Sequence, residues 1–139
     1  MNAQIGKIVK EILDRVNKDD FLEFTETQCE ELEEIDESGE SIDPLLKIFE
    51  DYPNTDFGMP GPLVHFLERF YRKGYEEKLI NSINRKPTSH TLWMLNRIIN
   101  DVEGKIKDDL ISVLSDVLRR DDIDNETRNA ANEFIGLHT

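Results

Sequence analysis

The sequence predicts an all-α protein of seven or eight short helices. Apolar residues recur three and four positions apart along almost the whole chain, which is the spacing of an amphipathic helix. No segment alternates apolar and polar residues with the two-residue period of a strand, so a β-sheet is not expected. A length of 139 residues is that of one domain, and we expect a single helical domain over residues 1–139.

Three helices are predicted in the first fifty residues. The first spans residues 3–17, where six apolar side chains form one stripe. The second is an acid-rich stretch that follows Phe21–Phe24 and ends at residues 38–41, Ser-Gly-Glu-Ser, because that composition favours a turn. The third is short, with Asp43 as its N-cap and Pro44 in its first turn.

The longest predicted loop runs from Asp51 to Pro62. Three prolines and two glycines in this segment prevent a regular helix. A densely apolar helix follows the loop and ends near Gly74, and Tyr75–Ile83 forms the next helix.

Three more helices are predicted in the last third of the chain. Thr88 or Ser89 caps the first of them, Gly104 separates it from the second, and the polar turn 121–125 leads into the third. Helices of this length, joined by short turns, pack as antiparallel neighbours. Successive pairs then stack into a HEAT-like or irregular helical-repeat bundle.

The net charge is negative and is concentrated in one segment. Thirty acidic residues oppose 17 basic residues, which gives a formal charge of −13. Residues 19–56 hold fifteen acids and one base and carry −14, whereas the remaining residues together carry +1. This charge argues against a protein that coats DNA or RNA and against binding to anionic membranes, because both require a cationic face.

The densest part of this acidic segment is a candidate docking surface for a basic protein. Clustered charge raises the rate of association with an oppositely charged partner by about 10- to 1000-fold at low salt. Tyr52 and Phe57 in the long loop are expected to be exposed aromatic anchors beside it. A solvated face that only aids solubility is the alternative interpretation. The expected partner-binding residues are Glu30, Glu31, Glu33, Glu34, Asp36, Glu37, Tyr52 and Phe57.

The sequence predicts no catalytic, metal or cofactor site. His65 and Glu68 have the spacing of two metal ligands on a helix, but a third ligand with matching spacing is missing. Cys29 lies among carboxylates, which disfavour a thiolate, so we expect a small core residue. Pro60 and Pro62 lack the backbone donors that a phosphate-binding loop uses. We therefore expect no enzymatic activity, no cofactor and no small-molecule substrate.

The chain also lacks the features of a membrane or exported protein. No apolar run approaches the 18 or so residues that span a bilayer, and charged residues interrupt the apolar positions near the N-terminus. The single cysteine excludes an internal disulfide framework. We therefore expect a soluble cytoplasmic protein.

Two segments in the middle of the chain have distinctive motifs. They are GMPGPLVHFLE at residues 58–68 and PTSHTLWMLNR at residues 87–97, with Tyr75, Leu79 and Ser82 between them. With these motifs the chain resembles the helical immunity proteins of bacterial toxin–immunity systems, including polymorphic toxins and contact-dependent growth inhibition. The resemblance covers about residues 56–100, one third of the chain.

The resemblance implies a small bacterial protein that binds and neutralises the C-terminal toxin domain delivered by a sibling cell. Many such toxins are nucleases, and a ribonuclease is favoured here. A nuclease presents a basic cleft to its substrate, which an acidic helical protein would occlude. The main alternative is a helical-repeat adaptor or scaffold for an unrelated basic protein. A nucleic-acid mimic ranks after it, and an enzyme ranks last.

Overall fold

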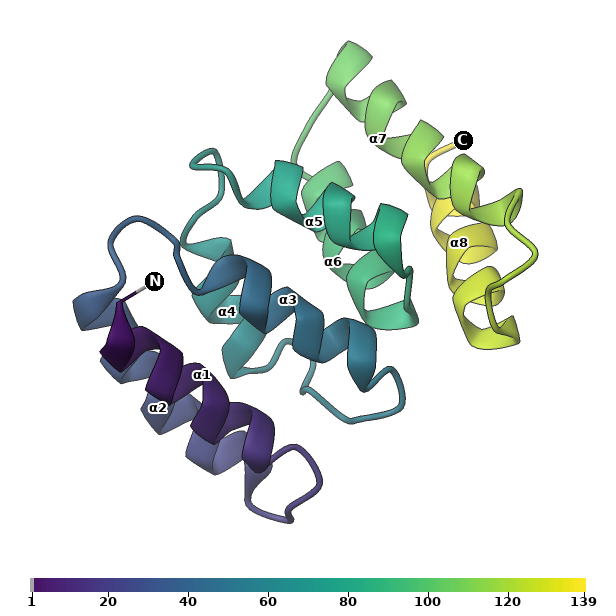
Figure 1. Cartoon of the computed structure of the whole chain (residues 1–139). Coiled ribbons are helices and arrows are strands. Elements are labelled where there is room, and N and C mark those ends of the chain that lie inside the picture. Colours follow the sequence, from purple (N-terminus) through teal and green to yellow (C-terminus); the bar gives the residue numbers. More distant parts are fainter. Residues whose placement is uncertain (1) are drawn as a thin grey trace. The chain divides into compact units, whose positions relative to one another are not determined.

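The computed structural model describes residues 2–139 and confirms the predicted all-α fold. Helices make up 68% of the chain, and residues 2–139 contain no strand. Eight helices follow one another in this described part of the chain (Figure 1). They are α1 (Ala3–Asp14), α2 (Phe21–Ile35), α3 (Ile42–Asp51), α4 (Pro62–Glu68), α5 (Tyr75–Arg85), α6 (Ser89–Ile99), α7 (Gly104–Leu118) and α8 (Asn125–Leu137).

The contacts of the chain separate it into two compact units. The first unit ends at Tyr75 and contains α1 to α4, and the second extends from Glu76 to Thr139 and contains nearly all of α5 and the whole of α6 to α8. Each unit has its own buried apolar side chains. That the two form one domain remains a prediction.

In the first unit, α2 packs against both α1 and α4, and α1 also contacts α3. Figure 1 shows α1 and α2 side by side, running in opposite directions. This arrangement buries the apolar stripe that the sequence predicts on α1 together with stripes from the other three helices. The buried residues include Ile5, Ile8, Ile12, Phe21, Leu32, Leu45, Leu46, Phe49, Leu63, Phe66 and Leu67.

In the second unit, α8 packs against α6 and α7, and α6 and α7 also contact each other. The shared core includes Leu92, Leu95, Ile99, Leu114, Val117, Ala131 and Phe134. The imidazole Nε2 of His138 lies 2.7 Å from Oδ1 of Asn96, which ties the end of α8 to α6. The guanidinium of Arg128 donates to the backbone oxygens of Leu118 and Arg120 at the end of α7, at 3.1 and 2.9 Å. Leu118 is the last residue of α7, so its carbonyl has no partner inside the helix and the arginine caps it.

Some predicted helix ends are confirmed and others are shifted. Thr88 is the N-cap of α6, and it exchanges hydrogen bonds with Thr91 as in a capping box. The predicted N-cap Asp43 is wrong, because α3 begins after Ser41 and places Pro44 at its third residue. Proline is tolerated there because the N–H groups of the first turn have no partner inside the helix. The predicted helix that ends near Gly74 stops at Glu68 and continues as turns.

Candidate functional site

The acidic segment predicted from the sequence centres on helix α2. One side of α2 is buried through Phe21, Thr25, Cys29 and Leu32. A helix turns once every 3.6 residues, so the buried stripe occupies one side and the intervening positions face water. Exposed carboxylates fill those positions: Glu23, Glu26, Glu30, Glu31, Glu33 and Glu34, followed by Glu37 after the helix end. We call this set the α2 acidic face.

Few of these carboxylates have partners within the protein. Glu33 Oε2 forms an ion pair with the Arg69 guanidinium at 2.9 Å, and Glu31 Oε1 accepts a hydrogen bond from the Gln4 side chain at 3.4 Å. Within residues 2–139, the other carboxylates of the α2 acidic face have no ion pair. The structure exposes five of the predicted partner-binding residues, as a binding role requires. They are Glu30, Glu31, Glu33, Glu34 and Glu37.

Asp36 was expected on the same surface, but it lies inside the protein. Its side chain is only 3% exposed, and its two oxygens accept hydrogen bonds from three backbone N–H groups and one hydroxyl. The N–H groups of Gly39, Glu40 and Ser41 are each 2.9 Å away, and the fourth donor is the Ser41 hydroxyl. Asp36 therefore shapes the turn between α2 and α3 and is not available to a partner.

The hydrogen bonds around Asp36 also set its ionisation. Burial alone raises the pKa of a carboxyl group, because it disfavours the charged form. Here the hydrogen bonds from the Ser41 hydroxyl and from the N–H groups of Ser41, Glu40 and Gly39 outweigh burial, and they lower the pKa of Asp36 below its ordinary value. The carboxylate that organises this turn is thus ionised at neutral pH.

Phe57 was also expected to be exposed, and this expectation is wrong. Phe57 is 2% exposed, and its ring centroid lies 4.3 Å from that of Phe49 and 5.8 Å from that of Phe21. The loop folds back tightly after it: a Cβ atom on Gly61 would lie 1.5 Å from the Phe57 carbonyl oxygen. Only glycine fits at position 61, and the turn it permits directs the Phe57 ring into the core.

The large apolar residue that this loop does expose is Met59, which is 82% exposed. Tyr52, the other predicted aromatic anchor, is half-buried. Met59 was not predicted from the sequence, because apolar periodicity carries no information inside a turn. Its position between Gly58 and Pro60 was the available signal, since a residue at the tip of a tight turn faces outward.

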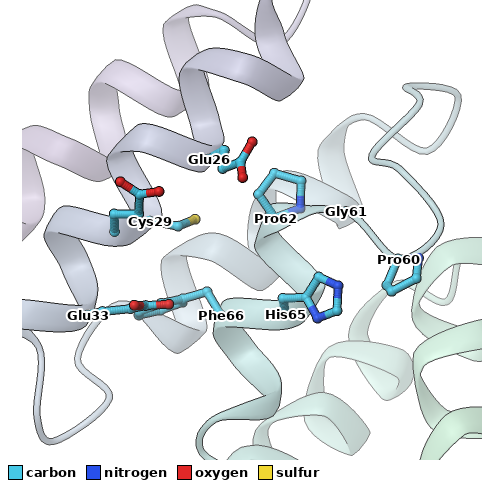
Figure 2. Close-up of a pocket in the computed structure, with 9 residues that line it drawn as sticks. Glu26, Cys29, Glu33, Pro60, Gly61, Pro62, His65 and Phe66 are labelled. Carbon is cyan, nitrogen blue, oxygen red and sulfur yellow. The ribbon is translucent and has the colours of Figure 1, made fainter.

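A pocket of about 420 Å³ lies between α2 and the start of α4. Its α2 side is lined by Glu26, Cys29, Glu30 and Glu33, and its other side by Pro60, Gly61, Pro62, His65 and Phe66. Figure 2 shows the carboxylates reaching the pocket from α2, with Pro62 and His65 across from them. We call this the α2–α4 pocket. A smaller pocket of about 270 Å³ lies at the other end of α2, between Asn2 and Ile5 and residues 34–40.

Cys29 in the α2–α4 pocket does not have the properties of a nucleophile. It is 4% exposed, and burial raises the pKa of its thiol to about 12, with further contributions from the charges of Glu33 and Glu26. The thiol is therefore protonated at neutral pH. This agrees with the interpretation of Cys29 as a buried core residue.

The three histidines lie at separate places in the part of the chain that the structure describes. His65 is exposed at the α2–α4 pocket, His90 is half-buried, and His138 contacts Asn96. Within residues 2–139, no group of three or more His, Cys, Asp or Glu side chains is arranged to hold a metal ion.

None of the described helices is long and apolar enough to cross a membrane. In comparisons with known proteins, no protein-family model, no curated protein and no solved structure matches this chain.

Proposed function

We propose that this protein binds a basic protein domain through the α2 acidic face and neutralises a toxin by doing so. The observation that carries the proposal is the set of exposed carboxylates that have no ion pair within residues 2–139, among them Glu30, Glu34 and Glu37. Like charges one turn apart on a helix are destabilising by a few tenths of a kcal/mol per pair. Their concentration on one helix therefore does not serve the stability of the fold, and a cationic partner would relieve it.

The chemistry of such a partner follows from the charge. A nuclease binds the phosphates of its substrate with lysine and arginine side chains in a cleft. The α2 acidic face would engage those side chains and block access of the nucleic acid. Long-range attraction would speed the encounter, and the contacts made after docking would set the lifetime of the complex.

The toxin role in particular rests on the resemblance of residues 58–68 and 87–97 to helical immunity proteins. The first of these segments contributes Pro60, Gly61, Pro62 and His65 to the α2–α4 pocket. The segment that carries part of the resemblance thus lies beside the α2 acidic face, in the same unit of the chain. This proximity supports a shared role in binding.

Charge reversal on the α2 acidic face tests the proposal. The variant combines Glu30→Lys, Glu34→Lys and Glu37→Lys, all at exposed positions without ion pairs in the described chain. Glu33 is left unchanged, because a lysine there would lie beside the Arg69 guanidinium. The readouts are survival of cells that express the protein encoded directly upstream of this gene, and co-purification of the two proteins. We expect normal helical circular dichroism, with loss of both protection and co-purification.

A matched control reverses three acids in the second unit, Asp108→Lys, Asp121→Lys and Glu133→Lys, which are also exposed and have no ion pair in the described chain. It changes the net charge by the same amount and should protect as well as the wild type. If the α2 variant protects fully, the interface lies elsewhere and the proposal fails. Co-purification without protection by the wild type would instead favour the adaptor function.

A further inference from the structure

One large apolar side chain of the first unit faces water almost completely. Met59 is 82% exposed, whereas the exposures of Leu13, Ile106 and Leu137 are 37%, 63% and 65%. A methionine left in water gives up the free energy that its burial would provide. Single apolar residues are nevertheless common on protein surfaces, so exposure alone does not indicate a binding role. The structure of the surrounding turn is what distinguishes Met59.

The turn that carries Met59 is fixed on both sides by buried side chains. Two residues before it, the Phe57 ring packs against the rings of Phe49 and Phe21 in the core. Four residues after it, Leu63 is only 1% exposed. The short segment 58–62 thus connects two points of the core, which leaves its backbone little freedom to move.

Close packing of the backbone restricts this turn further. The Gly58 N–H donates a hydrogen bond to Oδ1 of Asp56 at 2.9 Å. Gly58 has a φ of +88°, which favours glycine, and a Cβ atom there would lie 2.5 Å from Cα of Gly61. The backbone at positions 58 and 61 is therefore too close for a side chain at either position. Met59 projects from a turn whose conformation is already set.

The same turn lies beside the α2 acidic face. Pro60 and Gly61, which directly follow Met59, line the α2–α4 pocket across from the glutamates of α2 (Figure 2). Helices α2 and α4 also pack against each other within the first unit. A protein that covered the α2 acidic face beside this pocket would therefore meet the turn and its exposed methionine.

Charged and apolar contacts have different roles in such a complex. Carboxylates attract a cationic partner over a distance and so raise the rate of association. The lifetime of the complex depends more on a few side chains that become buried in well-packed pockets of the partner. A turn that is held in place before binding loses little conformational entropy when the partner immobilises it. The unbranched side chain of methionine also adapts to the shape of the pocket that it enters.

We propose that Met59 inserts into an apolar pocket of the protein partner, next to the lysine and arginine side chains that the α2 acidic face engages. This inference deepens the proposed function and takes its partner, a basic protein, from it. It adds a requirement on that partner, whose cationic surface must border an apolar pocket large enough for a methionine side chain. The α2 acidic face then speeds the encounter, and Met59 slows the release.

The experiment measures association and dissociation rates between the full chain and the protein encoded directly upstream, by surface plasmon resonance at about 0.15 M salt. Met59→Gln keeps the net charge and replaces the thioether by an amide. We expect this variant to dissociate about tenfold faster, which corresponds to about 1.4 kcal/mol, and to associate within about twofold of the wild-type rate. Met59→Leu retains the apolar volume and should dissociate within about threefold of the wild-type rate. A wild-type dissociation rate for Met59→Gln would overturn the proposal.

A matched control removes a different exposed apolar side chain. Ile106 is 63% exposed and lies in the second unit, so Ile106→Gln should leave both rates within about twofold of the wild type. Because both positions are exposed, both glutamine variants should keep the circular dichroism and urea midpoint of the wild type. Equally fast dissociation of the two variants would show that exposed apolar surface in general holds the complex, and the assignment to Met59 would fail.

The outcomes separate this inference from the proposed function. If the wild type binds and protects but Met59→Gln has no effect, the role of Met59 alone is refuted. If Met59→Gln speeds dissociation but the triple charge reversal on the α2 acidic face has no effect, Met59 is upheld and the charge contribution is refuted. If the wild type does not bind the upstream-encoded protein, the proposed function is refuted and this inference falls with it.

Discussion

Replacing Asp36 by asparagine tests the most connected side chain in the turn between α2 and α3. One oxygen of Asp36 accepts from the N–H groups of Gly39 and Glu40, and the other accepts from the N–H and the hydroxyl of Ser41. Asparagine has almost the same shape but presents one oxygen and one NH₂ group. The substitution therefore changes hydrogen bonding while it leaves packing nearly unchanged.

The expected cost follows from counting donors. The better orientation places the new NH₂ group toward Ser41, because the Ser41 hydroxyl can turn and accept from it. The Ser41 N–H is then left buried without an acceptor, which costs about 1–3 kcal/mol. The remaining bonds lose the strengthening that a charged acceptor provides. We expect Asp36→Asn to lower the free energy of unfolding by about 2–4 kcal/mol.

Urea denaturation followed by circular dichroism measures this loss. The control is Glu37→Gln, which removes the same charge from the neighbouring exposed position and should change stability by less than about 0.5 kcal/mol. The effect also depends on pH. Because the pKa of Asp36 is lower in the folded state than in the unfolded state, its contribution is present above about pH 4 and is lost as the pH falls through the folded-state value. A loss below about 1 kcal/mol at pH 7, or a difference that persists unchanged at acid pH, would refute this reasoning.

Two more predictions concern the loop before α4 and the end of α8. Gly61→Ala should lower the free energy of unfolding by at least about 2 kcal/mol in urea denaturation, because its Cβ would collide with the Phe57 carbonyl oxygen. The control is Gly136→Ala on α8, where a Cβ meets open space, and it should be neutral or stabilising by up to about 1 kcal/mol. Burial lowers the pKa of His138, so its neutral form is favoured in the folded state, and stability should fall as the pH drops below about 6.5. His138→Gln, which can still bond to Asn96, should reduce that fall, and thermal melts at pH 7.5 and 5.5 measure it; an equal fall in the variant would contradict the assignment.

The periodicity of apolar residues was enough to predict the fold class and most helices. On α1, for example, Ile5, Ile8 and Ile12 recur at helical spacing and all are buried. A helix cap at Thr88 or Ser89 was also predictable, because either hydroxyl can accept a hydrogen bond at a helix N-terminus, and the structure has the cap at Thr88. Both signals are local in the sequence, and the packing of the helices reinforced them.

Asp36 and Phe57 were predicted to be exposed but are buried. Their burial depends on turn geometry, which apolar periodicity does not reveal. Asp36 follows an acidic run, and its composition resembles that of its exposed neighbours. What distinguishes it is the segment Asp36–Ser41, in which Gly39 takes a positive φ and lets three N–H groups converge on one carboxylate. The burial of Phe57 likewise depends on a glycine four residues later. Such turns combine residues whose individual propensities predict only a loop.

The division of α2 into a buried stripe and an acidic face affects how its sequence can diverge. The residues that hold α2 in place, such as Phe21 and Leu32, are separate from the glutamates that face water. Substitutions on the outer face can therefore change its charge without disturbing the residues that pack the helix into the core. Asp36 is the exception. It continues the acidic run in the sequence, but it is buried and its hydrogen bonds hold the turn between α2 and α3. If related sequences varied the exposed glutamates of this run but kept Asp36, the fold and the exposed face would be shown to constrain the sequence separately.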